Sequence, residues 1–171
     1  MSSGGARLAV RGAARDAVLR ALDAVLSREG YAPFDAARVP RNYPEQKREF
    51  ARFAVAPPDP DGVVWLRAAD WDRAFARAMH LSGELPGATV VALVTPPADR
   101  PRWKAYRAGD LVLKAGDDPD DELFYNPVLA DAAATDAFLA EWSPSRTIAE
   151  PEADGDPRLY LSRRSRLYLE S

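Results

Sequence analysis

The chain has 171 residues, of which 47% are hydrophobic and 29% are charged, and its net charge is −3. These values are typical of one globular domain and exclude an intrinsically disordered chain. The absence of cysteine excludes disulfides, thiolate metal sites and cysteine nucleophiles, and no apolar run approaches the roughly 20 residues that span a bilayer. We therefore expect a cytoplasmic protein, and the excess of arginine over lysine indicates a GC-rich bacterial gene.

In the first part of the chain, short periodic segments alternate with turns. Residues 7–11 alternate like a half-exposed strand, and residues 14–28 follow a helical period. Residues 49–55 and 63–67 are predicted strands. They are joined by a turn at residues 59–62, in which proline presets φ and glycine accepts a positive φ. A connection this short predicts an antiparallel pair.

A second helix is expected over residues 71–82, with Asp70 as its N-cap. The apolar side chains of this segment follow a helical period, which places Arg77 and His80 on the solvent-facing side. His80 is the only histidine of the chain, and on such a face a histidine is more often a solvated side chain than a general base. No zinc site or Cys–His pair is therefore expected.

Further strands and one more helix are predicted downstream. Residues 89–94 are apolar on both faces, as in a central strand, and residues 103–107 and 111–114 are expected to form a hairpin. A last helix is predicted over residues 126–142, which begin with Asn-Pro. Most neighbouring strands are joined by turns too short for a parallel crossover, so the sheet is predicted to be mainly antiparallel.

We predict an α+β fold in which about five to six strands, mainly antiparallel, are packed by two or three helices. The domain is expected to span residues 1–142, followed by an acidic linker with proline and glycine at residues 143–157. Residues 158–171 are a basic-aromatic C-terminal tail, in which Arg-Leu-Tyr-Leu occurs twice and supplies the rings of Tyr160 and Tyr168. The tail adds to the sheet of its own domain or to another protein, and the sequence leaves both open.

Motifs for catalysis and cofactor binding are scarce. The sequence has no Gly-x-Ser-x-Gly elbow, no phosphate-binding loop that ends in Gly-Lys-Ser/Thr and no dinucleotide-binding glycine spacing. Asp35 with Glu45 and Lys47 resembles the acid…Glu-x-Lys pattern of metal-dependent nucleases, in which carboxylates hold magnesium and lysine steadies the attacking water. Apart from this pattern, no catalytic residue, metal site or cofactor is predicted.

Acidic residues are concentrated in one part of the chain. Residues 115–157, which we call the acidic block, contain twelve acids against one arginine. Such a segment is usually solvated and self-repelling, but it also suits a surface that attracts a basic partner. The candidates for this surface are Asp117, Asp118, Asp120, Asp121 and Glu122.

The predicted hairpin combines bases with aromatic rings, namely Arg102, Trp103, Lys104, Tyr106 and Arg107. Such a set anchors protein interfaces or stacks on nucleobases. In a strand, Trp103 and Tyr106 point to opposite faces, so one of the two rings is expected in the core. The pI of 5.3 disfavours nucleic acid as the partner.

These observations predict a non-enzymatic, bacterial intracellular protein-binding module that acts by charge complementarity, as an immunity- or inhibitor-type partner of a basic protein would. Two alternatives stay open. One is a metal-dependent hydrolase or nuclease that uses Asp35, Glu45 and Lys47. The other is a nucleic-acid-binding module that uses residues 102–107. The sequence does not identify the partner or the oligomeric state.

Overall fold

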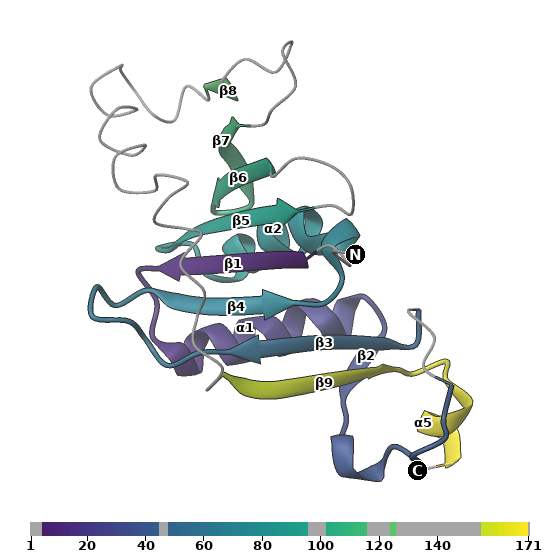
Figure 1. Cartoon of the computed structure of the whole chain (residues 1–171). Helices are drawn as coiled ribbons and strands as arrows, with labels where there is room; N and C mark the ends of the chain where they lie inside the picture. The colour runs from purple at the N-terminus through teal and green to yellow at the C-terminus, as the bar shows by residue number, and fades with distance from the viewer. Residues whose placement is uncertain (1–4, 45–47, 96–101, 116–123, 126–154, 171) are drawn as a thin grey trace.

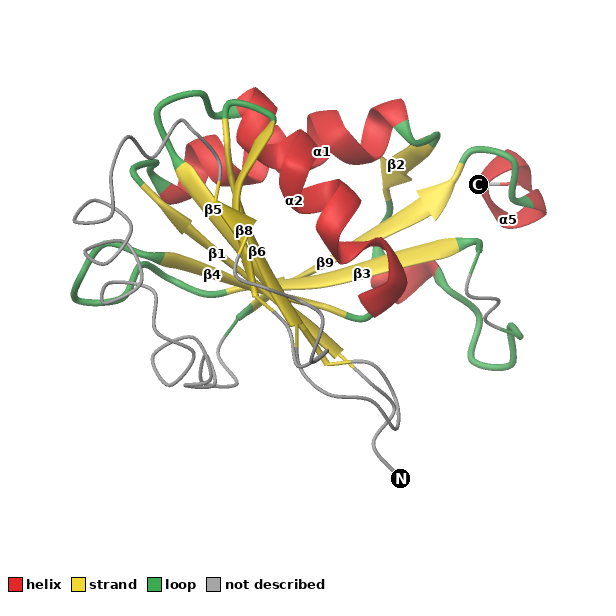
Figure 2. Ribbon diagram, turned by 90° about the horizontal axis from the view of Figure 1, so that it is seen from above, coloured by secondary structure: helices red, strands yellow, loops and turns green. Residues whose placement is uncertain are grey.

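The computed structural model describes residues 5–44, 48–95, 102–115, 124–125 and 155–170. They form a nine-stranded antiparallel sheet, with two helices lying against one of its faces (Figures 1 and 2). The predicted α+β class and antiparallel pairing are confirmed. The predicted number of five to six strands is too low, because two of the additional strands have only two or three residues and the third belongs to the C-terminal tail.

The first half of the chain forms β1 (Gly5–Arg11), α1 (Arg15–Arg28), β2 (Tyr31–Pro33), the 3-10 turn η1 (Ala36–Arg38), β3 (Phe50–Val55) and β4 (Val64–Ala68). Helix α1 ends next to Gly30, whose φ of +91° is a conformation that favours glycine. The turn between β3 and β4 is built as predicted. The Asp59 carboxylate accepts hydrogen bonds of 2.9 Å from the backbone N–H groups of Asp61 and Val63.

The second half forms the 3-10 turn η2 (Trp71–Arg73), α2 (Ala74–Glu84), β5 (Thr89–Thr95), β6 (Arg102–Arg107), β7 (Asp110–Ala115), β8 (Phe124–Tyr125), β9 (Asp156–Ser162) and α5 (Arg166–Glu170). The predicted hairpin corresponds to β6 and β7. Its turn contains Ala108 and Gly109, both with positive φ, as a type I′ hairpin turn requires. The predicted helix over residues 126–142 lies outside the described residues.

The strands follow the order β2-β9-β3-β4-β1-β5-β6-β7-β8, so that β1 is central and pairs with β4 and β5. Figure 2 shows α1 and α2 on the same side of this sheet. Between the helices and the sheet lies the main core, which includes Leu8, Val10, Leu22, Leu26 and Leu81, each exposed by 2% or less. Each such side chain stabilises the fold by roughly 1.5–3 kcal/mol.

The C-terminal tail takes part in the sheet through β9, which lies between β2 and β3. The Tyr160 ring packs edge-on against Phe53, and its hydroxyl donates a 2.5 Å hydrogen bond to Asp23 of α1. Of the two arrangements considered for the tail, addition to its own sheet is therefore the one found. The second Arg-Leu-Tyr-Leu copy is not a strand but begins α5, because the Ser165 hydroxyl accepts the Leu167 N–H and caps a helical turn.

Candidate functional site

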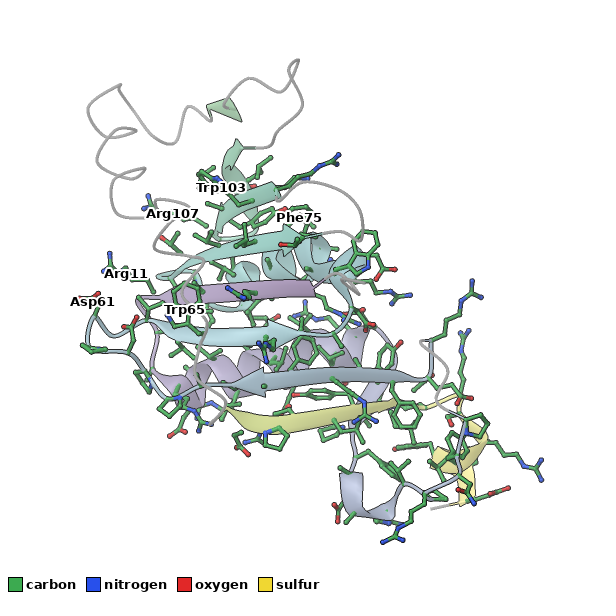
Figure 3. All side chains as sticks on the ribbon, in the orientation of Figure 1. Arg11, Asp61, Trp65, Phe75, Trp103 and Arg107 are labelled. Carbon is green, nitrogen blue, oxygen red and sulfur yellow. The ribbon has the colours of Figure 1, made fainter. Side chains whose placement is uncertain are left out.

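The predicted hairpin surface does not present its aromatic rings to solvent. Trp103 and Tyr106 are 6% and 5% exposed. They belong to two clusters on opposite faces of the sheet. Tyr106 lies on the helix side, and Trp103 lies on the other side in the cluster that also contains Trp65 (Figure 3). The prediction that the rings point to opposite faces is confirmed. The sequence predicted only one of the two rings in the core, but both are buried, because both faces of β6 carry buried apolar side chains.

The charged members of the hairpin are partly committed to neighbours. The Lys104 ammonium lies 4.4 Å from the centre of the Phe75 ring, and the Arg107 guanidinium donates to the Thr89 hydroxyl at 2.9 Å. Arg102 is exposed at the start of β6. In the tail, Tyr160 is buried and Tyr168 is half-buried. Most of the residues predicted as a binding surface in the hairpin therefore make contacts within the fold.

Several other predicted residues lie outside the described part of the chain. These are Asp117, Asp118, Asp120, Asp121 and Glu122 of the acidic block, and Glu45 and Lys47 of the nuclease-like pattern. The immunity- or inhibitor-type role that the acidic block motivates therefore stays a prediction. Asp35 is described, and its carboxylate accepts the Ala37 N–H at 2.9 Å as the N-cap of η1. Among the described residues, no group of three or more histidine or acidic side chains could hold a metal ion, and His80 is exposed.

The clearest candidate site is a pocket of about 600 Å³ that is lined by five arginines from four segments, Arg28, Arg48, Arg73, Arg163 and Arg164. These segments are the end of α1, the residue pair before β3, the turn η2 and the turn between β9 and α5. Figure 1 shows why they meet, since β2 and β9 run side by side and α5 follows at their end. The pocket also contains Glu29 and Glu49, which leaves its lining with a net charge of +3. We call it the arginine pocket.

Two of these arginines are paired within the protein. Arg28 forms an ion pair with Glu84 of α2, and Arg73 forms one with Glu29 at 3.3 Å. The side chains of Arg28 and Arg73 are 59% and 49% exposed, so solvent screens both pairs. Their contribution to stability is therefore small, but they orient two guanidinium groups at the rim of the pocket.

The other three arginines are less constrained. Arg163 donates to the Ser27 hydroxyl at 3.0 Å. The guanidinium groups of Arg48 and Arg164 make no ion pair or hydrogen bond within the part of the chain that the structure describes, and both residues are exposed. Two full positive charges with open donor sets thus line the same pocket.

The wall of the pocket is held by the backbone. Ser162 N–H donates to the Glu49 carbonyl at 2.7 Å, and Arg163 N–H donates to the Gly30 carbonyl at 2.9 Å. On the facing side, the Tyr31 hydroxyl donates to the Arg48 carbonyl at 2.9 Å. These bonds fix the backbone from which the guanidinium groups project. Less conformational entropy of the protein is therefore lost when a ligand binds.

Beneath the pocket lies a buried ionic cluster around Arg77. Its side chain is 3% exposed, and it donates to Glu29 at 3.1 Å and to Asp70 at 3.2 Å while lying over the Phe53 ring. The expectation that Arg77 faces solvent is wrong, because this side of α2 packs against the end of α1, where Glu29 supplies a counter-charge. Asp70 likewise does not cap the helix, which starts only at Ala74, but pairs with Arg77 instead.

Sequence reasoning missed the arginine pocket, although Arg163-Arg164 between the two tail repeats is a visible signal. Comparison of the chain with models of protein families, with curated proteins and with solved structures finds no match. In the described part of the chain, no helix has the length and apolar character needed to cross a membrane. The arrangement itself can attract and hydrogen-bond an anion, since it combines excess positive charge with unpaired guanidinium donors.

Proposed function

We propose that the protein is a non-enzymatic binding protein that holds an anionic segment of another protein in the arginine pocket. The observation that carries this proposal is the set of five arginines around one pocket, in which Arg48 and Arg164 have no internal partner within the described residues. The whole chain has a net charge of −3, so the pocket is a local reversal of its overall charge. Charge complementarity then selects an acidic partner.

A protein partner fits the pocket better than a free small molecule does. Small-molecule sites are mostly apolar and enclose most of the ligand. None of the described residues that line the arginine pocket has an aliphatic side chain, and all five arginines are exposed. A charged group that is presented on a larger partner needs no such enclosure, because the rest of the partner covers the rim.

An apolar contact lies next to the charged one. Leu169 of α5 is 76% exposed, and its N–H donates to the carbonyl of Ser165, which lines the pocket. Tyr168, which precedes it, is half-buried. Arginine and tyrosine beside an apolar side chain are a composition typical of protein interfaces. We therefore assign α5 to the same binding surface.

The proposal is tested with a short fluorescein-labelled peptide of alternating glutamate and glycine, whose binding is followed by fluorescence anisotropy. The pocket variant Arg48→Gln/Arg164→Gln is expected to weaken binding on the order of tenfold, since hydrogen bonds to charged groups contribute about 1.5–3 kcal/mol each before solvent screening. Affinity is also expected to fall as salt is added, because the groups are exposed.

The matched control is Arg20→Gln/Arg102→Gln, which removes the same charge from exposed positions outside the pocket. Its affinity is expected to stay within about twofold of that of the unchanged protein, because a distant exposed charge is screened. Equal losses in the control and the pocket variant would show only non-specific attraction. A larger loss in the control would instead transfer the site to the hairpin, where Arg102 lies.

A further inference from the structure

We infer that the anionic group held in the arginine pocket is a phosphate monoester carried on a side chain of the partner protein. This inference rests on the proposed function and names the chemistry of its ligand. Three features of the described pocket residues carry it: two guanidinium groups without a partner among these residues, two glutamates that form no ion pair with them, and the hydroxyl of Ser162.

The charge available in the pocket exceeds what a carboxylate uses. A carboxylate carries one negative charge, so two guanidinium groups around it leave one positive charge without a counter-charge. The described structure leaves two guanidinium forks without a partner, those of Arg48 and Arg164. A phosphate monoester carries about −1.5 to −2 charges near pH 7 and presents three acceptor oxygens, so it can engage both forks at once.

The two glutamates of the pocket do not neutralise these forks. Glu29 is held by Arg73 and by the buried Arg77. Glu49 accepts a hydrogen bond from the Tyr43 hydroxyl at 3.1 Å. Neither carboxylate forms an ion pair with Arg48 or Arg164 among the described residues. The glutamates lower the net charge of the lining to +3, which still attracts a dianion.

A neutral donor completes the set. The Ser162 hydroxyl oxygen accepts a hydrogen bond of 3.3 Å from the backbone N–H of Arg164. The hydroxyl hydrogen of Ser162 can then donate to a ligand. Ser162 is half-buried and lines the pocket. Two guanidinium groups and a hydroxyl thus supply hydrogen-bond donors to the same pocket. They match a ligand whose polar atoms are all hydrogen-bond acceptors, such as a dianionic phosphate.

Three labelled peptides test the inference with the full-length protein. They share one sequence of glycines around a central residue, which is phosphoserine, glutamate or serine. We expect the phosphoserine peptide to bind about tenfold more tightly than the glutamate peptide, and the serine peptide not to bind. Inorganic phosphate is expected to displace the phosphoserine peptide, whereas chloride at matched ionic strength displaces it less.

Two variants connect this preference to the two forks. Arg48→Gln/Arg164→Gln should remove the difference between the phosphoserine and glutamate peptides, whereas Arg20→Gln/Arg102→Gln should retain it. Arg48→Lys/Arg164→Lys keeps both charges but loses the planar fork, so the preference for phosphoserine should shrink while weak binding persists. A preference that is fully retained in the lysine variant would contradict recognition by the forks.

The outcomes separate the inference from the proposed function. If the glutamate peptide binds as tightly as the phosphoserine peptide and both are lost in the pocket variant, the phosphate inference is wrong and the acidic-segment proposal stands. If neither peptide responds to the pocket variant, both are wrong. Adenosine monophosphate distinguishes the source of the phosphate: tighter binding of this nucleotide than of the phosphoserine peptide would overturn the assignment to a protein side chain.

Discussion

Arginines occupy two contrasting regions at the same end of the molecule. Arg77 is buried and its guanidinium group is shared between the carboxylates of Glu29 and Asp70. Arg48 and Arg164 line the pocket together with Glu29, and they are exposed and have no partner within the described residues. Arginine therefore stabilises the fold in one region and is available to a ligand in the other.

The difference follows from what water does for a charge. An exposed guanidinium group is solvated, so it costs nothing to leave it unpaired, and an ion pair at the surface contributes only about 0–1 kcal/mol. A buried guanidinium group has lost this solvation, so its partners must be present in the folded state. Residues that can be removed without loss of stability are thus the ones to examine for binding.

The largest effect is expected from Arg77→Ala. The substitution leaves the Asp70 and Glu29 carboxylates without their buried counter-charge, and we expect the free energy of unfolding to fall by about 3–5 kcal/mol. Urea denaturation measures it. The matched control is Arg73→Ala, which removes an exposed partner of the same Glu29 and should cost about 0–1 kcal/mol. Equal losses in the two variants would remove the distinction between the regions.

Glu29→Gln affects both regions, because Glu29 pairs with Arg77 below and with Arg73 at the rim. We expect the free energy of unfolding to fall by about 1–3 kcal/mol, since a charged partner of Arg77 is replaced by a neutral one. At the same time the pocket gains one positive charge, so the acidic peptides should bind more tightly. Lower stability combined with unchanged peptide affinity would show that the cluster and the pocket are independent.

Deprotonation of the buried Tyr106 phenol at high pH tests the effect of a charge in the core that has no counter-charge. Burial raises the pKa of Tyr106 to about 12, from an ordinary value of 10.0. Because the folded pKa lies above the unfolded one, the stability linked to the neutral phenol is fully present below pH 10 and is lost as the pH rises through about 12. Tyr106→Phe should therefore show a flatter fall in stability over this range, measured by urea denaturation at several pH values. An identical fall in both proteins would mean that the pKa of Tyr106 is the same in the folded and unfolded states.

The smallest effect on stability is expected from the pocket variant. Arg48→Gln/Arg164→Gln removes two exposed groups without internal partners among the described residues, so the free energy of unfolding should stay within about 0.5 kcal/mol. Thermal or urea unfolding checks it, alongside the loss of peptide binding expected above. A variant that loses several kcal/mol would place these arginines with Arg77 as structural residues.

Local patterns explain which elements could be predicted. The helix expected over residues 14–28 is α1, and the strands around the turn at residues 59–62 are β3 and β4, because periodicity and turn chemistry act within a few residues. The short strands β2 and β8 could not be predicted in this way, since two or three residues show no period. Strand β2 forms only because β9, which is distant in the sequence, pairs with it, and β8 forms by pairing with the end of β7.

The sequence by itself determined the α+β class, the antiparallel pairing, the two main helices and the lack of cysteine chemistry, all of which depend on composition and on contacts between near neighbours. Only the tertiary structure decided that Trp103 and Tyr106 are both buried, that Arg77 has two counter-charges and that five arginines share a pocket. The physical reason is that burial and pairing depend on which surfaces meet. The arginine pocket exists because β9 returns the end of the chain to the edge of the sheet beside β2.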